Sequence, residues 1–218
     1  MSRASHGGPH RRRGERTLST DTARIPAAEV NGIQGRLITT MARRMLGKVP
    51  DSLGVMWHHP RVMKDAMGFG RKVEAWDELD KNLASFASMA AAAEIGCSFC
   101  LDLGYFMAHN HGLDEAKARE VPRWRESTVF TPAERRVMEY AEAMCQTPVA
   151  VTDELSTALL EDLGAAGLLE LTARVGFMNY SARGNIALGI GSDEFADACG
   201  LAPLAAPSKA APKVPSVA

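Results

Sequence analysis

The chain has 218 residues, long enough for one domain with a sizeable core, since domains commonly hold about 100–200 residues. Hydrophobic residues make up 46% and charged residues 23% of the sequence, which excludes a wholly disordered chain. The 25 Lys and Arg residues against 26 Asp and Glu residues give a net charge of -1. This balance argues against a protein dedicated to binding nucleic acid or an anionic membrane.

Composition divides the chain into three parts. Residues 1–24 are rich in Gly, Ser, Arg and His and are expected to form a disordered basic arm. Residues 25–203 are expected to form a single helical domain, and residues 204–218 a flexible tail rich in Ala and Pro. The arginines of the arm precede no apolar stretch, and no apolar run is long enough to cross a membrane, so we expect a cytoplasmic protein.

Several segments of residues 25–203 favour a helical conformation. Helices are expected over 33–46, 51–58 and 60–72, with Pro50 and Pro60 as boundaries. The next is expected over 77–95, where apolar residues recur at intervals of three and four and form one stripe. The members of this stripe are Leu79, Leu83, Phe86, Ala90 and Ala93.

Capping signals predict the later helices. Thr131 and Glu134 form a capping box with Pro132 at the first helical position, and open a helix to about Gln146. Thr152 opens another, to about residue 163, and a last long helix is expected over 165–190. Because no segment alternates with a period of two, the sequence predicts an all-α bundle of about seven helices.

One motif, the CxxC at residues 97–100, contains side chains that can react chemically. Gly96 is suited to end a helix, and a new helix is expected to begin at or near Cys97, with Cys100 one turn further on. The positive end of a helix favours a thiolate, which is the nucleophilic form of cysteine. The sequence therefore predicts a redox-active pair, in which one thiol attacks and the other resolves the product as a disulfide.

Two other interpretations of the pair stay open. The cysteines are either two buried side chains without a role or half of a zinc site, which needs about four ligands. Histidines are present to complete a zinc site: His58, His59, His109 and His111. The chain has no second CxxC motif, and its helical surroundings differ from a zinc ribbon, so we expect no metal. Cys145 and Cys199 are expected to be small buried hydrophobic residues.

Three segments resemble the carboxymuconolactone decarboxylase superfamily, and within it the alkylhydroperoxidase D-like branch. The first is GCSFCLDLG at 96–104, which follows an Ala-rich stretch. The second is LELT at 169–172, followed by Asn179, Arg183 and ALGI at 187–190. The third is LGKVP at 46–50, followed by His59 and Pro60. The resemblance covers roughly residues 36–203.

The resemblance implies an all-α fold that assembles as trimers or as hexamers of such trimers. It also implies thiol-dependent reduction of hydroperoxides, without a cofactor. By this resemblance Cys100 attacks the peroxide, whereas Cys97 resolves the product and exchanges with an external dithiol reductant. Decarboxylase members of the superfamily lack the cysteine pair, so the pair favours the redox branch.

The chain departs from this branch at two proton-relay positions. The branch commonly has a His four residues after the second cysteine, where this chain has Gly104, and a Glu twelve residues before the first, where it has Ser85. Neither the usual general base nor its carboxylate partner is therefore present. One interpretation is that Gly104 opens space for the substrate or for a side chain of a neighbouring subunit.

Other side chains are candidates for the missing roles. Glu94, three residues before Cys97, and Tyr105, whose long side chain can reach around its helix, are candidate proton relays. Asn179 and Arg183, four residues apart on the last long helix, are candidate contacts to a substrate or a neighbouring subunit. The more common role of such a pair is to tie helices together.

We therefore expect a peroxiredoxin-type alkylhydroperoxidase whose Cys97–Cys100 pair reduces an organic hydroperoxide. Its partners are expected to be the hydroperoxide, an external dithiol and further copies of the chain, with no nucleic acid and no membrane. Two alternatives remain: a redox-sensing or interaction protein on the same fold, and a cysteine-independent enzyme of the decarboxylase kind.

Overall fold

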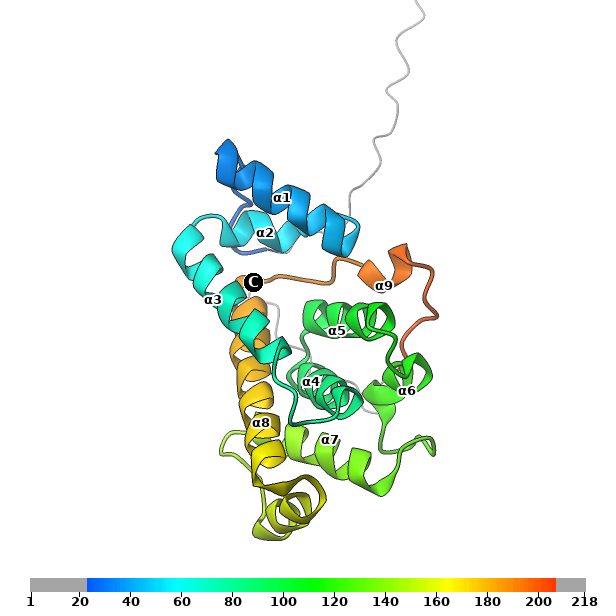
Figure 1. Cartoon of the computed structure of the whole chain (residues 1–218). Coiled ribbons are helices and arrows are strands. Elements are labelled where there is room, and N and C mark those ends of the chain that lie inside the picture. The colour runs from blue at the N-terminus through cyan, green and yellow to red at the C-terminus, as the bar shows by residue number, and fades with distance from the viewer. Residues whose placement is uncertain (1–22, 207–218) are drawn as a thin grey trace, which may run out of the picture.

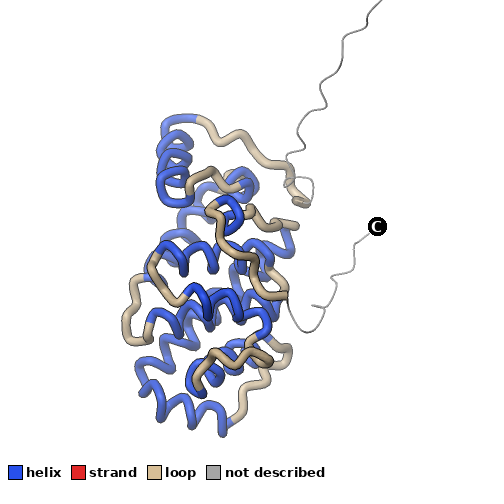
Figure 2. Tube along the Cα trace, turned by 90° about the vertical axis from the view of Figure 1, so that its right-hand side faces the viewer, coloured by secondary structure: helices blue, strands red, loops and turns tan. Residues whose placement is uncertain are grey.

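A computed structural model describes residues 23–206. Within that range the chain forms nine α-helices, one short 3₁₀ turn and no strand (Figure 2). The α-helices are α1 (Gly32–Leu46), α2 (Asp51–Met56), α3 (Pro60–Glu74), α4 (Lys81–Ile95), α5 (Ser98–Asn110), α6 (Glu115–Glu120), α7 (Pro132–Cys145), α8 (Asp153–Leu188) and α9 (Phe195–Ala198). The 3₁₀ turn η2 covers Val121–Arg123.

The predicted all-α fold is confirmed, with more helices than the seven expected. The additional ones are α6, of 6 residues, and α9, of 4 residues, and they are too short to show a helical period in sequence. The expected basic arm lies outside the described residues except for its last two positions. The expected tail lies outside them from residue 207 onward.

Helix α4 is the centre of the molecule. It lies between α5 and α7, and α8 runs along one side of this stack (Figure 1). The buried residues of α4 are Ala84, Phe86, Ala87, Met89, Ala90, Ala91 and Ala92. They surround the helix rather than form the single stripe that we expected, because α4 packs against neighbours on several sides. Its alanines allow these neighbours to approach closely.

Local signals set the helix ends. The carboxylate of Asp80 accepts hydrogen bonds from the amides of Asn82 and Leu83, so α4 begins at Lys81, later than expected. The capping box of Thr131 and Glu134 is present at the start of α7, as predicted. Burial acts to raise the pKa of Glu134, but hydrogen bonds from Lys117 and Thr131 together hold it below its usual value.

Helix α8 comprises the two segments that we expected as separate helices, and the break between them lies where the sequence predicted it. The element spans 36 residues, and its backbone is non-helical at Gly164, whose φ of 69° lies in the left-handed region. Beyond the kink, Glu170 accepts hydrogen bonds from the amides of Glu78 and Leu79 and is paired with Arg174 at 2.7 Å. This buried pair fixes α8 against the connection that leads into α4.

None of the helices in residues 23–206 combines the length and the apolar character that crossing a membrane requires.

Candidate active site

The cysteine pair lies at the junction of α4 and α5. Helix α4 ends at Gly96, which is left-handed at φ 85°, and Cys97 is the N-cap of α5, as the sequence predicted. Cys97 and Cys100 form a disulfide with their Cα atoms 5.3 Å apart. The sulfur of Cys97 also accepts a hydrogen bond from the amide of Cys100 at 3.2 Å. The amide of Cys100, in the first turn of α5, thus faces the pair, a placement that favours a thiolate when the disulfide is reduced.

The surroundings of the pair are apolar and nearly closed. Cys97 is 2% and Cys100 is 6% exposed. The residues packed around them are Ala92, Ile95, Phe99, Leu101, Met178, Ala182 and Ile186. None of these side chains carries a charge, so a thiolate formed here depends on a few nearby N–H groups.

A polar side chain from the end of α8 reaches the second sulfur. The side-chain nitrogen Nδ2 of Asn185 lies 3.4 Å from the sulfur of Cys100 and donates to it. Asn185 was not among the residues that we singled out from the sequence. It lies 85 positions after Cys100, and no local pattern indicates that the two residues meet.

The two positions that lack a relay residue, 85 and 104, both face a methionine. The hydroxyl of Ser85 contacts the sulfur of Met89 at 3.9 Å, and a Cβ atom added at Gly104 would lie 3.0 Å from Cγ of Met89. Met89 is almost fully buried. The interpretation that Gly104 opens space for a substrate is therefore wrong, because the side chain of Met89 fills that space.

The two candidate relays make contacts of other kinds. Glu94 is exposed and forms a hydrogen bond with the side chain of Gln146. Tyr105 is fully buried, and its hydroxyl donates to the carbonyl of Ala202 at 3.1 Å. Burial raises the pKa of Tyr105, which disfavours its ionisation. A relay role for either residue stays a prediction.

Asn179 and Arg183 lie beside a different cysteine. Asn179 donates to the sulfur of Cys145 at 3.4 Å and accepts from Arg183 at 3.2 Å, while Arg183 also donates to the carbonyl of Cys145 at 2.5 Å. They thereby connect α8 to the end of α7. Burial raises the pKa of Cys145 to about 11, so this thiol stays protonated at neutral pH. Cys199, which we expected to be buried, is exposed.

Three of the four histidines weighed as zinc ligands have separate contacts. Nδ1 of His59 accepts from the amide of Val62 and caps α3, and Nε2 of His58 contacts the carbonyl of Pro26 at 2.7 Å. His109 pairs with Glu115. Among residues 23–206, no group of three or more His, Cys, Asp or Glu side chains is arranged to hold a metal ion.

An aspartate in α5 holds the segment that follows α8. The carboxylate of Asp102, which is buried, accepts from the hydroxyl of Ser192 and from the amides of Phe195 and Ala196, at 2.8, 2.9 and 3.0 Å. The ring of Phe195 then packs against Phe99, with 6.2 Å between ring centroids. Helix α9 is thus anchored against α5.

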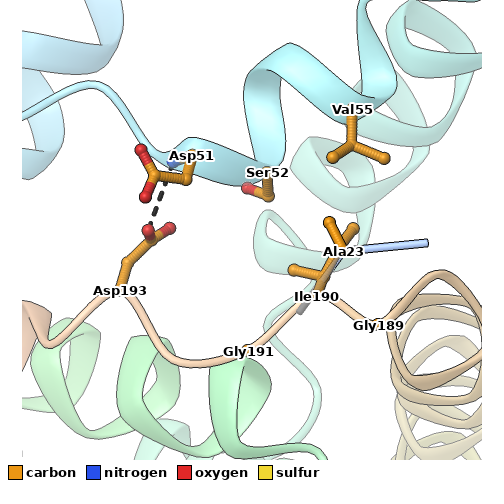
Figure 3. Close-up of a pocket in the computed structure, with 8 residues that line it drawn as sticks. All are labelled: Ala23, Asp51, Ser52, Val55, Gly189, Ile190, Gly191 and Asp193. Carbon is orange, nitrogen blue, oxygen red and sulfur yellow. Dashed lines mark hydrogen bonds between the residues drawn. The ribbon is translucent and has the colours of Figure 1, made fainter. Parts of the chain in front are cut away.

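A small cavity lies apart from the cysteines, between α2 and the segment after α8 (Figure 3). Asp193 points from this segment toward α2 and accepts a hydrogen bond from the amide of Asp51 at 3.2 Å (Figure 3). Its second oxygen, Oδ2, is buried and has no hydrogen-bond partner among the described residues. Burial raises the pKa of Asp193.

Comparisons with known sequences agree with the resemblance. Residues 60–143 match the carboxymuconolactone decarboxylase family. The uncharacterized protein YnjA of Escherichia coli K12 is 38% identical over 112 residues, which make up 51% of this chain. The matched part spans 62% of YnjA, so it covers less than two thirds of that relative.

Solved structures share the architecture at low sequence identity. The debrominase Bmp8, solved in complex with 2,3,4-tribromopyrrole, is 17% identical with a TM-score of 0.69, over 83% of this chain and 96% of its own. A peroxidase-related protein of Ralstonia eutropha JMP134 with an alkylhydroperoxidase AhpD core is 19% identical, also with a TM-score of 0.69, over 80% and 94% of the two chains. At such identities the similarity concerns the fold alone.

Proposed function

Residues 60–143 match the carboxymuconolactone decarboxylase family and the chain has the alkylhydroperoxidase D-like fold, and from these two findings we propose that it reduces organic hydroperoxides with its cysteine pair. The observation that carries the proposal is the placement of Cys97 and Cys100 across the start of α5, at disulfide distance. A pair in this position can cycle between dithiol and disulfide.

The proposed cycle has three steps. The thiolate of Cys100 attacks the distal oxygen of the hydroperoxide, so that an S–O bond forms, the O–O bond breaks and the leaving alkoxide takes up a proton to become an alcohol. The thiol of Cys97 then attacks the sulfenic acid, which forms the S–S bond and releases water. An external dithiol returns two electrons and two protons to the pair and is itself oxidised to a disulfide.

The setting of the pair supports an organic rather than a charged substrate. The residues packed around Cys97 and Cys100 are apolar, so a charged substrate group beside the sulfurs would lose its hydration without meeting an opposite charge, whereas an alkyl group would not. The need for a dithiol reductant fits a reducing compartment, and a cytoplasmic location is part of the proposal.

Peroxide consumption by cysteine variants tests the proposal. Reduced protein with dithiothreitol is expected to consume cumene hydroperoxide, and Cys97→Ser and Cys100→Ser are each expected to lower turnover to background. Cys199→Ser is the matched control, because Cys199 is exposed and lies outside the pair. In Cys97→Ser, dimedone is expected to trap a sulfenic acid on Cys100. Turnover that persists in either pair variant overturns the proposal.

A second candidate function is a redox switch that does not turn over peroxide. It is favoured by the two relay positions, where the chain has Ser85 and Gly104 in place of acid–base groups and where the side chain of Met89 packs against both. In this case peroxide would convert the pair to a disulfide once, without catalytic cycles. Activity that survives alkylation of both thiols would instead indicate a cysteine-independent enzyme of the decarboxylase kind.

A further inference from the structure

We propose that the side-chain amide of Asn185 stabilises Cys100 as a thiolate in the reduced protein. Nδ2 of Asn185 lies 3.4 Å from the sulfur of Cys100 and donates to it. The description of Cys100 as the attacking sulfur rests on the proposed function, whereas the contact between the two side chains does not. Asn185 would then act on the reacting atom from a helix that is remote in sequence.

The burial of Cys100 makes such a donor necessary. The sulfur lies among apolar side chains, and a buried negative charge is unfavourable unless hydrogen bonds compensate its lost hydration. The sulfur of Cys97 has its own donor, the amide of Cys100. Asn185 gives the second sulfur an equivalent donor, so each member of the pair faces one N–H group.

The main chain around Asn185 fixes its position. The carbonyl of Asn185 accepts from the amide of Ile190 at 2.9 Å, and the left-handed Gly189 closes the end of α8. Arg24 adds a side-chain hydrogen bond to the carbonyl of Ala187 at 2.7 Å. The last turn of α8 is therefore held in a defined geometry, as a donor aimed at one sulfur requires.

A second asparagine of α8 makes the same kind of contact with another cysteine, and the comparison shows that one amide hydrogen bond does not by itself stabilise a thiolate. Asn179 is also 3.4 Å from a cysteine sulfur, that of Cys145, and its hydrogen bond lowers the pKa of that thiol. Burial outweighs this contribution, and the pKa of Cys145 remains raised. Cys100 differs because it also lies in the first turn of α5, a helix of 13 residues whose N-terminus favours a negative charge.

The chemistry of an amide gives this arrangement a recognisable signature. An amide donates a hydrogen bond at every working pH but neither takes up nor releases a proton. Its stabilisation of the thiolate is therefore constant with pH, unlike that of a histidine. The reactivity of Cys100 is expected to rise through one ionisation, that of the thiol itself, with no second ionisation from a neighbouring base.

The test measures alkylation rather than peroxide turnover. In a reduced Cys97→Ser background, the rate at which iodoacetamide labels Cys100 is followed against pH, with the Cys100 peptide quantified by mass spectrometry. Asn185→Leu, which keeps the size of the side chain and removes the donor, is expected to move the midpoint of the pH profile upward by about one unit. Below the midpoint, labelling then slows about tenfold.

Further variants separate the contact from general damage to the fold. Asn185→Ala is expected to move the midpoint in the same direction, and circular dichroism checks that both variants are folded. Asn179→Leu is the matched control, because it removes the equivalent contact to Cys145 and is expected to leave the midpoint of Cys100 unchanged. An unmoved midpoint in folded Asn185→Leu or Asn185→Ala overturns the inference, as does an equal shift in Asn179→Leu.

The two proposals fail separately. A protein that does not consume peroxide but shows the shifted midpoint retains the role of Asn185 and loses the peroxidase function. A protein that consumes peroxide with the same pH profile in wild type and in Asn185→Leu retains the function and loses the role of Asn185.

Discussion

At the scale of single residues, Met89 lies beside both positions at which the chain departs from the redox branch that it resembles. Its side chain contacts Ser85 and lies next to the backbone of Gly104, the two positions where that branch carries its Glu and His. The protein thus has a buried thioether where a proton relay is expected. A histidine at position 104 would have to displace Met89, because Cβ alone would lie 3.0 Å from it.

We predict that Gly104→His destabilises the fold by about 1–3 kcal/mol, the usual cost of overpacking a core. The free energy of unfolding in urea measures the effect. Gly68→His in α3 is the control, because a Cβ atom at Gly68 meets no atom within 4 Å. Adding Met89→Ala is expected to be less costly in the Gly104→His background than in wild type, since the two residues share one space. A Gly104→His variant as stable as wild type would contradict the close contact.

At the scale of elements, two aspartates fix the connection between α8 and α9. Asp102 joins it to α5 through three hydrogen bonds, and Asp193 joins it to the start of α2. A helix of four residues such as α9 has little stability of its own, so these contacts determine its position. The two carboxylates differ in one respect: Oδ2 of Asp193 is buried without a hydrogen-bond partner among the described residues.

We predict that Asp193→Asn stabilises the protein at pH 7 by about 1 kcal/mol, because it removes an incompletely compensated buried charge. Burial raises the pKa of Asp193 in the folded state. The group therefore favours folding most below its unfolded pKa, and this contribution is lost as the pH rises through the folded pKa. The advantage of Asp193→Asn should shrink as the pH falls, which thermal unfolding at several pH values measures. Asp197→Asn, at an exposed site on α9, should show no such trend.

At the scale of the whole molecule, the described surface contains large apolar side chains on several helices, among them α1 and α8. Ile33 and Leu37 of α1 are 88% and 72% exposed, and Leu169 and Tyr180 of α8 are 70% and 60% exposed. Helix α1 buries only Gly35, although a helix of 15 residues generally needs tertiary contacts for its stability. These features support the proposal that the chain assembles as a homo-oligomer, with α1 and α8 in the interfaces.

We predict that the wild-type protein is a trimer or a hexamer in light scattering coupled to size-exclusion chromatography. Leu37→Glu is expected to lower the mass, because it places a charge in an apolar interface. Lys64→Glu, an exposed charge change on α3, is the control and should leave the mass unchanged. A monomeric wild type would exclude the proposed assembly. A mass that changes when the disulfide is reduced would favour the redox switch over the peroxidase.

The all-α class, most helix ends and the location of the cysteine pair could be predicted from the amino-acid sequence. These features depend on interactions within one or two helical turns, such as the capping box of Thr131 and Glu134 or the left-handed Gly96 before Cys97. Residues a few positions apart are close in any conformation, so their chemistry can be inferred from spacing.

The surroundings of the two sulfurs could not be predicted from the sequence and became visible in the folded chain. The contact of Asn185 with Cys100 joins residues 85 positions apart. The filling of the relay space by Met89 depends on how α4 packs against α5. Both depend on the packing of helices against each other, which no periodicity in the sequence specifies.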